Sequence, residues 1–221
     1  MNIKDAIIGR QSIRAFLPEK KISREIVHGI LNIARRAPSG SNIQPWKVYV
    51  ITGEKKVALS KACIARHNAG DQSDREYNYY PTTWRSPYLE RRRECGWGLY
   101  ASLDIKKDDK VAMNNQHGRN YTFFDAPVGL FITLDRELQL GSWLDTGMFI
   151  QSIMLAARHY GLETCPQAAF CNFFDTVIEH IGAPKNEILI TGIALGYPDP
   201  KAKVNTYRTT RIDVNEFTTY V

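Results

Sequence analysis

Polar side chains gather in a short loop that contains two prolines, residues 37–46 (Ala-Pro-Ser-Gly-Ser-Asn-Ile-Gln-Pro-Trp). Pro38 and Pro45 fix φ and restrict the residues before them, so we expect a stiff loop. The loop contains neither a carboxylate nor a histidine, which argues against an acid–base site. Its hydroxyls and amides instead suit a neutral polar ligand: Ser39, Ser41, Asn42 and Gln44.

A second polar cluster lies close to the start of the sequence. Arg10, Ser12 and Arg14 alternate along the chain, with Gln11 between the first two. In an extended backbone, alternate side chains share one face. Two guanidinium groups beside a hydroxyl suit an anion, above all a phosphate. Solvated arginines after a helix would give the same pattern, so this cluster by itself leaves both interpretations open.

Taken together, the two clusters resemble the FMN-dependent nitroreductase family. Within this family, residues 119–130 are most similar to the nitrobenzoate reductases, so a nitroaromatic acid is an expected substrate. The first cluster is an R-x-S-x-R motif and the second an A-P-S-G-S-N-x-Q-P-W motif. The resemblance covers essentially the whole chain, is weakest over residues 67–110, and ends in a basic tail with Arg208 and Arg211. Three further segments carry it: residues 120–127 (Asn-Tyr-Thr-Phe-Phe-Asp-Ala-Pro), 161–167 (Gly-Leu-Glu-Thr-Cys-Pro-Gln) and 192–198 (Gly-Ile-Ala-Leu-Gly-Tyr-Pro).

This resemblance implies which residues would hold FMN. Arg10 and Arg211 match the family's phosphate-binding arginines, and Ser12 lies beside the first of them. Arg14 matches a basic position near the flavin edge, where a cation would favour the fully reduced, anionic flavin. The loop that the family supplies from the partner subunit corresponds to Pro38, Ser39, Ser41 and Asn42, with Gln44 as the next polar candidate.

The same resemblance implies further contacts around the ring. The loop beside the flavin ring corresponds to Pro166, Gln167 and Ala168. Gln11 and Arg208 are looser matches to positions at the cofactor. Asn115 is a candidate for the ring edge, and Asn114 and Asn120 compete with it.

The resemblance also implies an activity. NAD(P)H would enter an open flavin pocket as an exchanging co-substrate, and its hydride would pass by way of FMN to a nitroaromatic or quinone-like acceptor. Flavin N5 does the chemistry, so no ionisable catalytic side chain is required. The sequence has no G-x-G-x-x-G after a strand, and its five histidines and four cysteines show no triad, C-x-x-C pair or metal-ligand spacing.

Two other functions stay open. Reductive dehalogenation of an iodotyrosine-like substrate would use the same scaffold, with Glu76, Tyr77 and Tyr80 near the substrate. A basic, non-catalytic binding module would account for the net charge of +6. The basic residues are interleaved with acids, as in residues 90–94, so a solvated helix face is favoured over a nucleic-acid partner.

A single domain over residues 1–221 has to position these groups. Helices mixed with a few buried strands, without regular alternation, predict the α+β class. The resemblance implies a central, mostly antiparallel sheet flanked by helices, in an intertwined homodimer. The periodicity predicts helices over residues 2–9 (capped by Asn2), from Ser23 to Pro38, and over 54–66, 89–105, 143–160 and 173–181 (capped by Asn172), and strands over 47–52, 127–134 and 188–195.

Two segments depart from ordinary patterns. Residues 143–160 are apolar on most sides, which indicates burial all round and makes this helix a candidate subunit interface. Residues 67–90 combine tyrosines, tryptophan and prolines with charges, without a clear period. This stretch predicts an aromatic lid or insertion within residues 67–110, or a surface segment that packs its rings on its own core.

The expected location is the cytoplasm. The longest apolar runs fall short of the roughly 20 residues that a membrane span needs. The first residues also lack the apolar stretch of a secretory signal. We therefore expect no membrane partner.

Overall fold

A four-stranded sheet in the order β1-β2-β4-β3 forms the centre of the protein, and each neighbouring pair is antiparallel. The computed structural model describes residues 1–71 and 75–221. The strands are β1 (Lys47–Thr52), β2 (Val128–Asp135), β3 (Glu163–Gln167) and β4 (Glu187–Gly196). The α+β prediction with a mainly antiparallel sheet is therefore confirmed.

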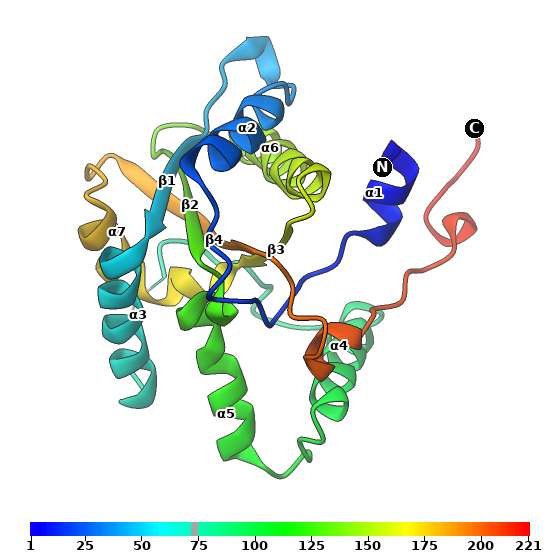
Figure 1. Ribbon diagram of the computed structural model, residues 1–221. Coiled ribbons are helices and arrows are strands. Elements are labelled where there is room, and N and C mark those ends of the chain that lie inside the picture. Colours follow the sequence, from blue (N-terminus) through cyan, green and yellow to red (C-terminus); the bar gives the residue numbers. More distant parts are fainter. Residues whose placement is uncertain (72–74) are drawn as a thin grey trace.

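Helices cover both faces of this sheet (Figure 1). Alternate residues of β2 separate the two faces: Val128, Leu130 and Ile132 pack with α2 and α6, and Phe131 packs with α3 and α7. The α-helices are α1 (Ile3–Gly9), α2 (Arg24–Ala34), α3 (Gly53–Asn68), α4 (Tyr88–Ser102), α5 (Lys110–Gly118), α6 (Leu140–His159) and α7 (Phe174–Ile181). The short 3₁₀ helices are η1 (Gly40–Asn42), η2 (Arg119–Asp125), η3 (Ala168–Phe173), η4 (Lys203–Thr206) and η5 (Val214–Glu216).

Local signals explain where several helices begin and end. The Asn2 side chain accepts a hydrogen bond from Asp5 N, and Ser23 Oγ accepts one from Ile26 N, as predicted. Gly182 ends α7 in the left-handed conformation, with φ of 67°. The predicted cap Asn172 is wrong: it lies within η3, and its amide donates to Tyr121 Oη at 3.3 Å.

An aromatic cluster fixes η2 and η3 against the sheet. A Cβ atom at Gly129 would lie 2.3 Å from the Phe123 ring, and one at Gly192 would lie 2.7 Å from the Phe170 ring. These two glycines therefore let the rings lie directly on β2 and β4. Phe123, Phe124 and Asp125 take positive φ values of 56°, 52° and 69°. This uncommon backbone buries two consecutive phenylalanines on the same side of the chain.

The two ends of the described chain meet at the edge of the sheet. Ser12 forms a parallel bridge with Thr164 of β3, and Ile13 N donates to Thr164 O at 3.1 Å. Phe16 forms a bridge with Pro198, just after β4. In Figure 1, α1 and the C-terminal segment lie at the right, beyond the layers that cover the sheet. Within the described residues, no helix has the length and apolar character to cross a membrane.

A buried carboxylate joins three strands. Glu187 begins β4 with its side chain only 2% exposed, and it accepts hydrogen bonds from Lys47 Nζ at 2.8 Å, Tyr49 Oη at 2.8 Å and Thr133 Oγ1 at 2.5 Å. Burial opposes ionisation, but the hydrogen bonds from Lys47, Thr133 and Tyr49 lower the pKa of Glu187 below its ordinary value. Ionised Glu187 therefore stabilises the sheet.

We expect Glu187→Gln to lower the free energy of unfolding by about 2 kcal/mol at pH 7, because charge-assisted hydrogen bonds are lost. The stabilisation from a carboxylate with a lowered pKa is present above the unfolded pKa and is lost as the pH falls through the folded pKa. The deficit should therefore narrow toward pH 4 in urea titrations followed by tryptophan fluorescence. Glu19→Gln, at an exposed position, is the control. A deficit that does not change with pH would contradict this role.

Candidate functional site

Arginines from both ends of the chain line one cavity of about 620 Å³. We call it the arginine cavity. The segment after α1 and the segment after η4 contribute the predicted residues: Arg10, Gln11, Ser12, Arg14, Arg208 and Arg211. The structure thus brings these six together, although up to 201 positions separate them in the sequence.

Asn205 joins the two segments that form this cavity. Its Oδ1 accepts a hydrogen bond from Arg14 N at 2.9 Å, and its Nδ2 donates to Ala15 O at 2.8 Å. Its carbonyl accepts from Gln11 Nε2 at 3.0 Å. Asn205 is a functional residue that the sequence analysis missed, because nothing in its local pattern shows a partner so distant along the chain.

The electrostatics of the arginine cavity suit an anion. Burial and then the charge of Arg211 lower the pKa of Arg10, while Glu163 partly opposes them. None of the described residues that line the cavity is a carboxylate. Like charges held together repel each other, and a bound dianion would relieve that repulsion. Guanidinium groups are also the preferred partners of phosphate oxygens.

Glu163 and Arg158 lie close to the arginine cavity as an ion pair, with Nη1 and Oε1 at 3.0 Å. Burial raises the pKa of Glu163, against the opposing charges of Arg158, Arg10 and Arg208. A Cβ atom at Gly9 would lie 2.6 Å from Arg158 Nη2, so the end of α1 packs directly on this pair. The pair therefore supports the backbone just before Arg10.

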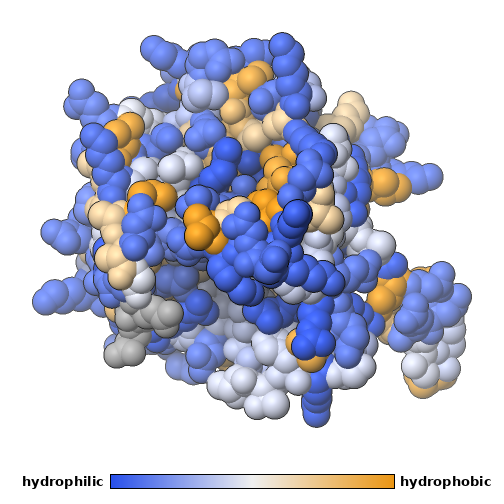
Figure 2. Space-filling view, turned by 90° about the horizontal axis from the view of Figure 1, so that it is seen from below, coloured by the Kyte–Doolittle hydropathy of each residue, from blue (hydrophilic) through white to orange (hydrophobic). Residues whose placement is uncertain are grey.

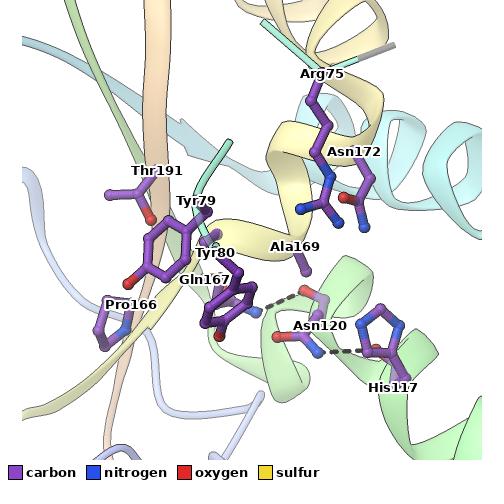
Figure 3. Close-up of a pocket in the computed structure, with 11 residues that line it drawn as sticks. Arg75, Tyr79, Tyr80, His117, Asn120, Pro166, Gln167, Ala169, Asn172 and Thr191 are labelled. Atoms are coloured by element: carbon purple, nitrogen blue, oxygen red, sulfur yellow. Dashed lines mark hydrogen bonds between the residues drawn. The ribbon is translucent and has the colours of Figure 1, made fainter. Parts of the chain in front are cut away.

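A second cavity of about 280 Å³ lies at the other end of β3 (Figure 3). We call it the amide cavity. It includes the predicted Pro166, Gln167 and Ala168. Gln167 Nε2 donates to Asn120 O at 2.7 Å, and Asn120 Nδ2 donates to His117 O at 2.9 Å. Gln167 Oε1 is buried and has no hydrogen-bond partner in the described structure.

β3 connects the two cavities. Its residue Thr164 pairs with Ser12 of the arginine cavity, and Pro166 and Gln167 line the amide cavity. Cys165 lies between them, and burial raises the pKa of its thiol. An elongated ligand with an anionic end and a polar ring edge can therefore extend along this strand, with its anion among the arginines.

The structure separates the three candidate asparagines. Asn120 lines the amide cavity, while Asn115 is exposed on α5 and lines neither cavity. The carbonyl of Asn114 lies 3.0 Å from His67 Nε2. The geometry therefore favours Asn120 at a ring edge, and a role for Asn115 stays a prediction.

The two-proline loop lies away from both cavities of its own chain. Ser39 Oγ accepts a hydrogen bond from Gln44 N at 3.0 Å, and Gly40 N donates to Asp145 Oδ2 of α6 at 3.1 Å. Trp46 stacks on Phe149, with ring centroids 4.5 Å apart. The predicted loop residues Pro38, Ser39, Ser41, Asn42 and Gln44 line neither cavity, and all but Ser39 are exposed.

The aromatic segment within residues 67–90 contributes side chains both to the core and to the amide cavity. Glu76 forms an ion pair with Arg136, and Tyr77 Oη donates to Ile190 O at 2.5 Å. Tyr79 and Tyr80 line the amide cavity. Of the residues considered for a halotyrosine, Glu76, Tyr77 and Tyr80, only Tyr80 lines this cavity. Residues 72–74 of the expected lid lie outside the described residues.

Comparison with known proteins identifies relatives along the whole chain. The family model described as "Nitroreductase family" matches residues 7–197. A 4-nitrobenzoate reductase of Nocardioides sp. (strain LMS-CY) is 39% identical over 221 residues, covering 98% of this chain and 89% of the relative. A 4-nitrobenzoate reductase of Pseudomonas putida is 40% identical over 218 residues, covering 98% and 95%.

A solved structure agrees closely with this fold. The FMN and NADPH-dependent nitroreductase NfnB from Sphigopyxis sp. strain HMH superposes with a TM-score of 0.95 at 35% identity. The match covers 100% of this chain and 99% of that chain. The matched region therefore includes all the residues that line the two cavities.

His117 offers a test of the amide cavity. Although the residue is exposed to solvent at one edge, partial desolvation of the imidazole, followed by the charges of His67 and Arg75, lowers the pKa of His117. The unfolded chain therefore binds more protons as the pH falls through about 6.5, and stability decreases in that range. We expect His117→Gln to flatten the dependence of unfolding midpoints on pH between 7.5 and 5. His28→Gln, on the exposed face of α2, is the control; equal slopes in both variants would refute the assignment.

Proposed function

Because this chain belongs to the nitroreductase family, we propose that it is an FMN-dependent oxidoreductase that reduces nitroaromatic or quinone-like acceptors with NAD(P)H. One observation carries the proposal: Arg10, Arg14 and Arg211, from distant parts of the chain, line one cavity beside β3. The names of the 4-nitrobenzoate reductases point to a small nitroaromatic acceptor. A cytoplasmic location, where NAD(P)H is available, is part of the same proposal.

The residues present fit FMN. The arginine cavity offers guanidinium groups to a phosphate, with the Ser12 hydroxyl beside them. At the amide cavity, the unpaired Gln167 Oε1 can accept a hydrogen bond from an N–H group of a ring edge. When bound, FMN supplies the two-electron chemistry, and the protein supplies binding, orientation and charge.

The residues of this chain have distinct parts in the proposed reaction. Arg10 and Arg211 hold the phosphate. Arg14 Nη1 donates to Ser12 O at 3.2 Å. This hydrogen bond holds the Arg14 guanidinium between the proposed phosphate site and β3. From there it stabilises negative charge that develops on the ring system. Cys165 stays a neutral thiol because burial raises its pKa, so it does not take part.

We further propose that the active unit is a homodimer. Leu140 and Leu144 of α6 are 82% and 70% exposed, and Asp145 of the same helix accepts a hydrogen bond from the two-proline loop. Ile7, Ile8 and Phe217 are also exposed. In Figure 2, apolar residues are visible on the projection at the right edge, the side on which Figure 1 places α1 and the C-terminal segment. A partner that covers these surfaces would bring its two-proline loop to the flavin.

The proposed cofactor predicts a coloured protein. We expect purified protein reconstituted with FMN to be yellow and to lose its absorbance near 450 nm when NADH or NADPH is added without oxygen. A nitroaromatic acceptor should restore the absorbance. Stopped-flow mixing with each nicotinamide, and then with an acceptor panel, measures both half-reactions. A protein that stays colourless with excess FMN would contradict the proposal.

Arg10 and Arg14 should differ in their effects. Arg10→Ala should raise the Kd for FMN about tenfold to a hundredfold, because one charge-assisted hydrogen bond is lost. Arg14→Ala should mainly make the flavin midpoint potential more negative, because it removes a charge that stabilises the reduced form. Fluorescence titration and dye-coupled potentiometry measure the two quantities. Unchanged affinity and potential in both variants would contradict these roles.

The homodimer also has a direct test. Leu144→Arg should give a monomer in size-exclusion chromatography with light scattering, because a buried unpaired charge opposes association. The monomer should bind FMN about tenfold more weakly or worse, since the partner's loop is lost. Val57→Arg, at an exposed apolar position on α3, is the matched control and should stay dimeric. A Leu144→Arg monomer with unchanged FMN affinity would refute the contribution of the partner.

A further inference from the structure

Arg75 is held at the amide cavity by the residues that follow it. Arg136 binds Glu76 and also donates from Nε to Lys185 O at 2.7 Å. Tyr77 inserts into the core, where its ring meets Trp143 edge-on at 4.7 Å. Two consecutive anchors thus fix the backbone next to Arg75. In Figure 3 the Arg75 side chain extends into the space bounded by Asn172, Ala169 and Asn120.

The described residues of this cavity offer no opposite charge to Arg75. Among the described residues, none that lines the amide cavity is a carboxylate, and Arg75 forms no ion pair there. The other polar groups that line it are neutral, since the pKa of His117 lies below its ordinary value. On the same wall, Asn172 Oδ1 is buried and has no hydrogen-bond partner among the described residues. In the part of the chain that the structure describes, the cavity is therefore a neutral polar pocket with one cation that forms no ion pair.

The opposite walls suit a single flat ring. Tyr79 and Tyr80 meet edge-on at 4.8 Å, and Tyr80 packs beside Trp84 at 5.5 Å. Arg92 of α4 covers the Trp84 ring at 4.9 Å, which restrains the aromatic row from outside. In Figure 3, Pro166 lies on the Tyr79 side of the cavity, away from Arg75. The volume of about 280 Å³ is small for a ligand site, which usually spans about 300–1,000 Å³.

These features distinguish between kinds of charged substrate. A zwitterionic amino acid needs a carboxylate for its ammonium group as well as a cation for its carboxylate. The adjacent acid, Glu76, is already paired with Arg136. A ring that carries one carboxylate matches the single cation.

From this geometry, we propose that Arg75 is a specificity-determining residue that binds the carboxylate of a monocyclic nitroaromatic acid. The acid lies against Tyr79 and Tyr80, with its carboxylate at Arg75 and its nitro group toward Gln167 of β3, where the proposed function places the ring edge of FMN. The inference rests on the proposed function, to which it adds a preference for anionic over neutral nitroarenes. That preference comes from Arg75, which forms no ion pair with any residue that the structure describes.

Kinetics with a charged and a neutral substrate of the same shape test the proposal. The FMN-loaded protein and its variants reduce 4-nitrobenzoate or 4-nitrobenzamide with NAD(P)H. We expect Arg75→Gln to raise KM for the acid about tenfold to a hundredfold, with KM for the amide and bound FMN unchanged. Arg75→Lys should recover part of the loss. Arg85→Gln removes the same charge from the same segment outside the cavity and should behave as wild type.

Binding of redox-inert ligands separates this inference from the proposed function. Calorimetry with benzoate and benzamide needs no turnover. Tighter binding of benzoate that Arg75→Gln abolishes supports the site even if no nitroarene is reduced. Reduction of the acid and the amide with equal efficiency, unaltered by Arg75→Gln, would overturn the inference while the proposed function stands. Loss of FMN from Arg75→Gln would also overturn it, because Arg75 would then serve the cofactor.

Discussion

The pairing of an N-terminal segment with the edge strand β3 is the contact on which the rest of the site depends. Ser12 and Ile13 meet Thr164 there, and the backbone hydrogen bond between them fixes the register of the residues on either side. Because side chains alternate along an extended segment, this register decides that Arg10 and Arg14 line the cavity. Asn205 then joins the basic segment after η4, which contains Arg208 and Arg211, to the N-terminal segment through hydrogen bonds with Gln11 and Arg14.

The amide cavity depends on a different constraint, the close approach of aromatic rings to the sheet. Gly129 and Gly192 leave room for Phe123 and Phe170, which hold η2 and η3 in place. Asn120 and Ala168 lie on these two elements. The left-handed backbone at Phe123 and Phe124 costs about 1–3 kcal/mol per residue, which the burial of both rings offsets. The strained turn is therefore part of how the cavity is built.

Local sequence signals predicted much of the fold. The strand at residues 47–52 and the caps Asn2 and Ser23 follow from side-chain pattern and hydrogen bonding within a few residues. β3 was expected as a loop, because it is short, contains Pro166 and is extended only through its pairing with β4. The positions of Arg75, Asn120 and Asn205 likewise depend on contacts between distant segments. The arginines of the first cavity were predicted only because their positions resemble a family's motifs. That Arg10, Arg14 and Arg211 meet in one cavity follows from the fold and not from any local pattern.

The hydrogen bonds of Asn205 to residues 11–15 have a consequence for the order in which the chain is synthesised and the arginine cavity is closed. Its hydrogen bond to Gln11 spans 194 positions, so the first half of the anion-binding wall is complete long before the second half leaves the ribosome. Until residue 205 has emerged, the two segments that line the arginine cavity are not joined. A chain truncated before residue 205 lacks both Asn205 and the second group of arginines, Arg208 and Arg211, and therefore lacks half of the anion-binding wall.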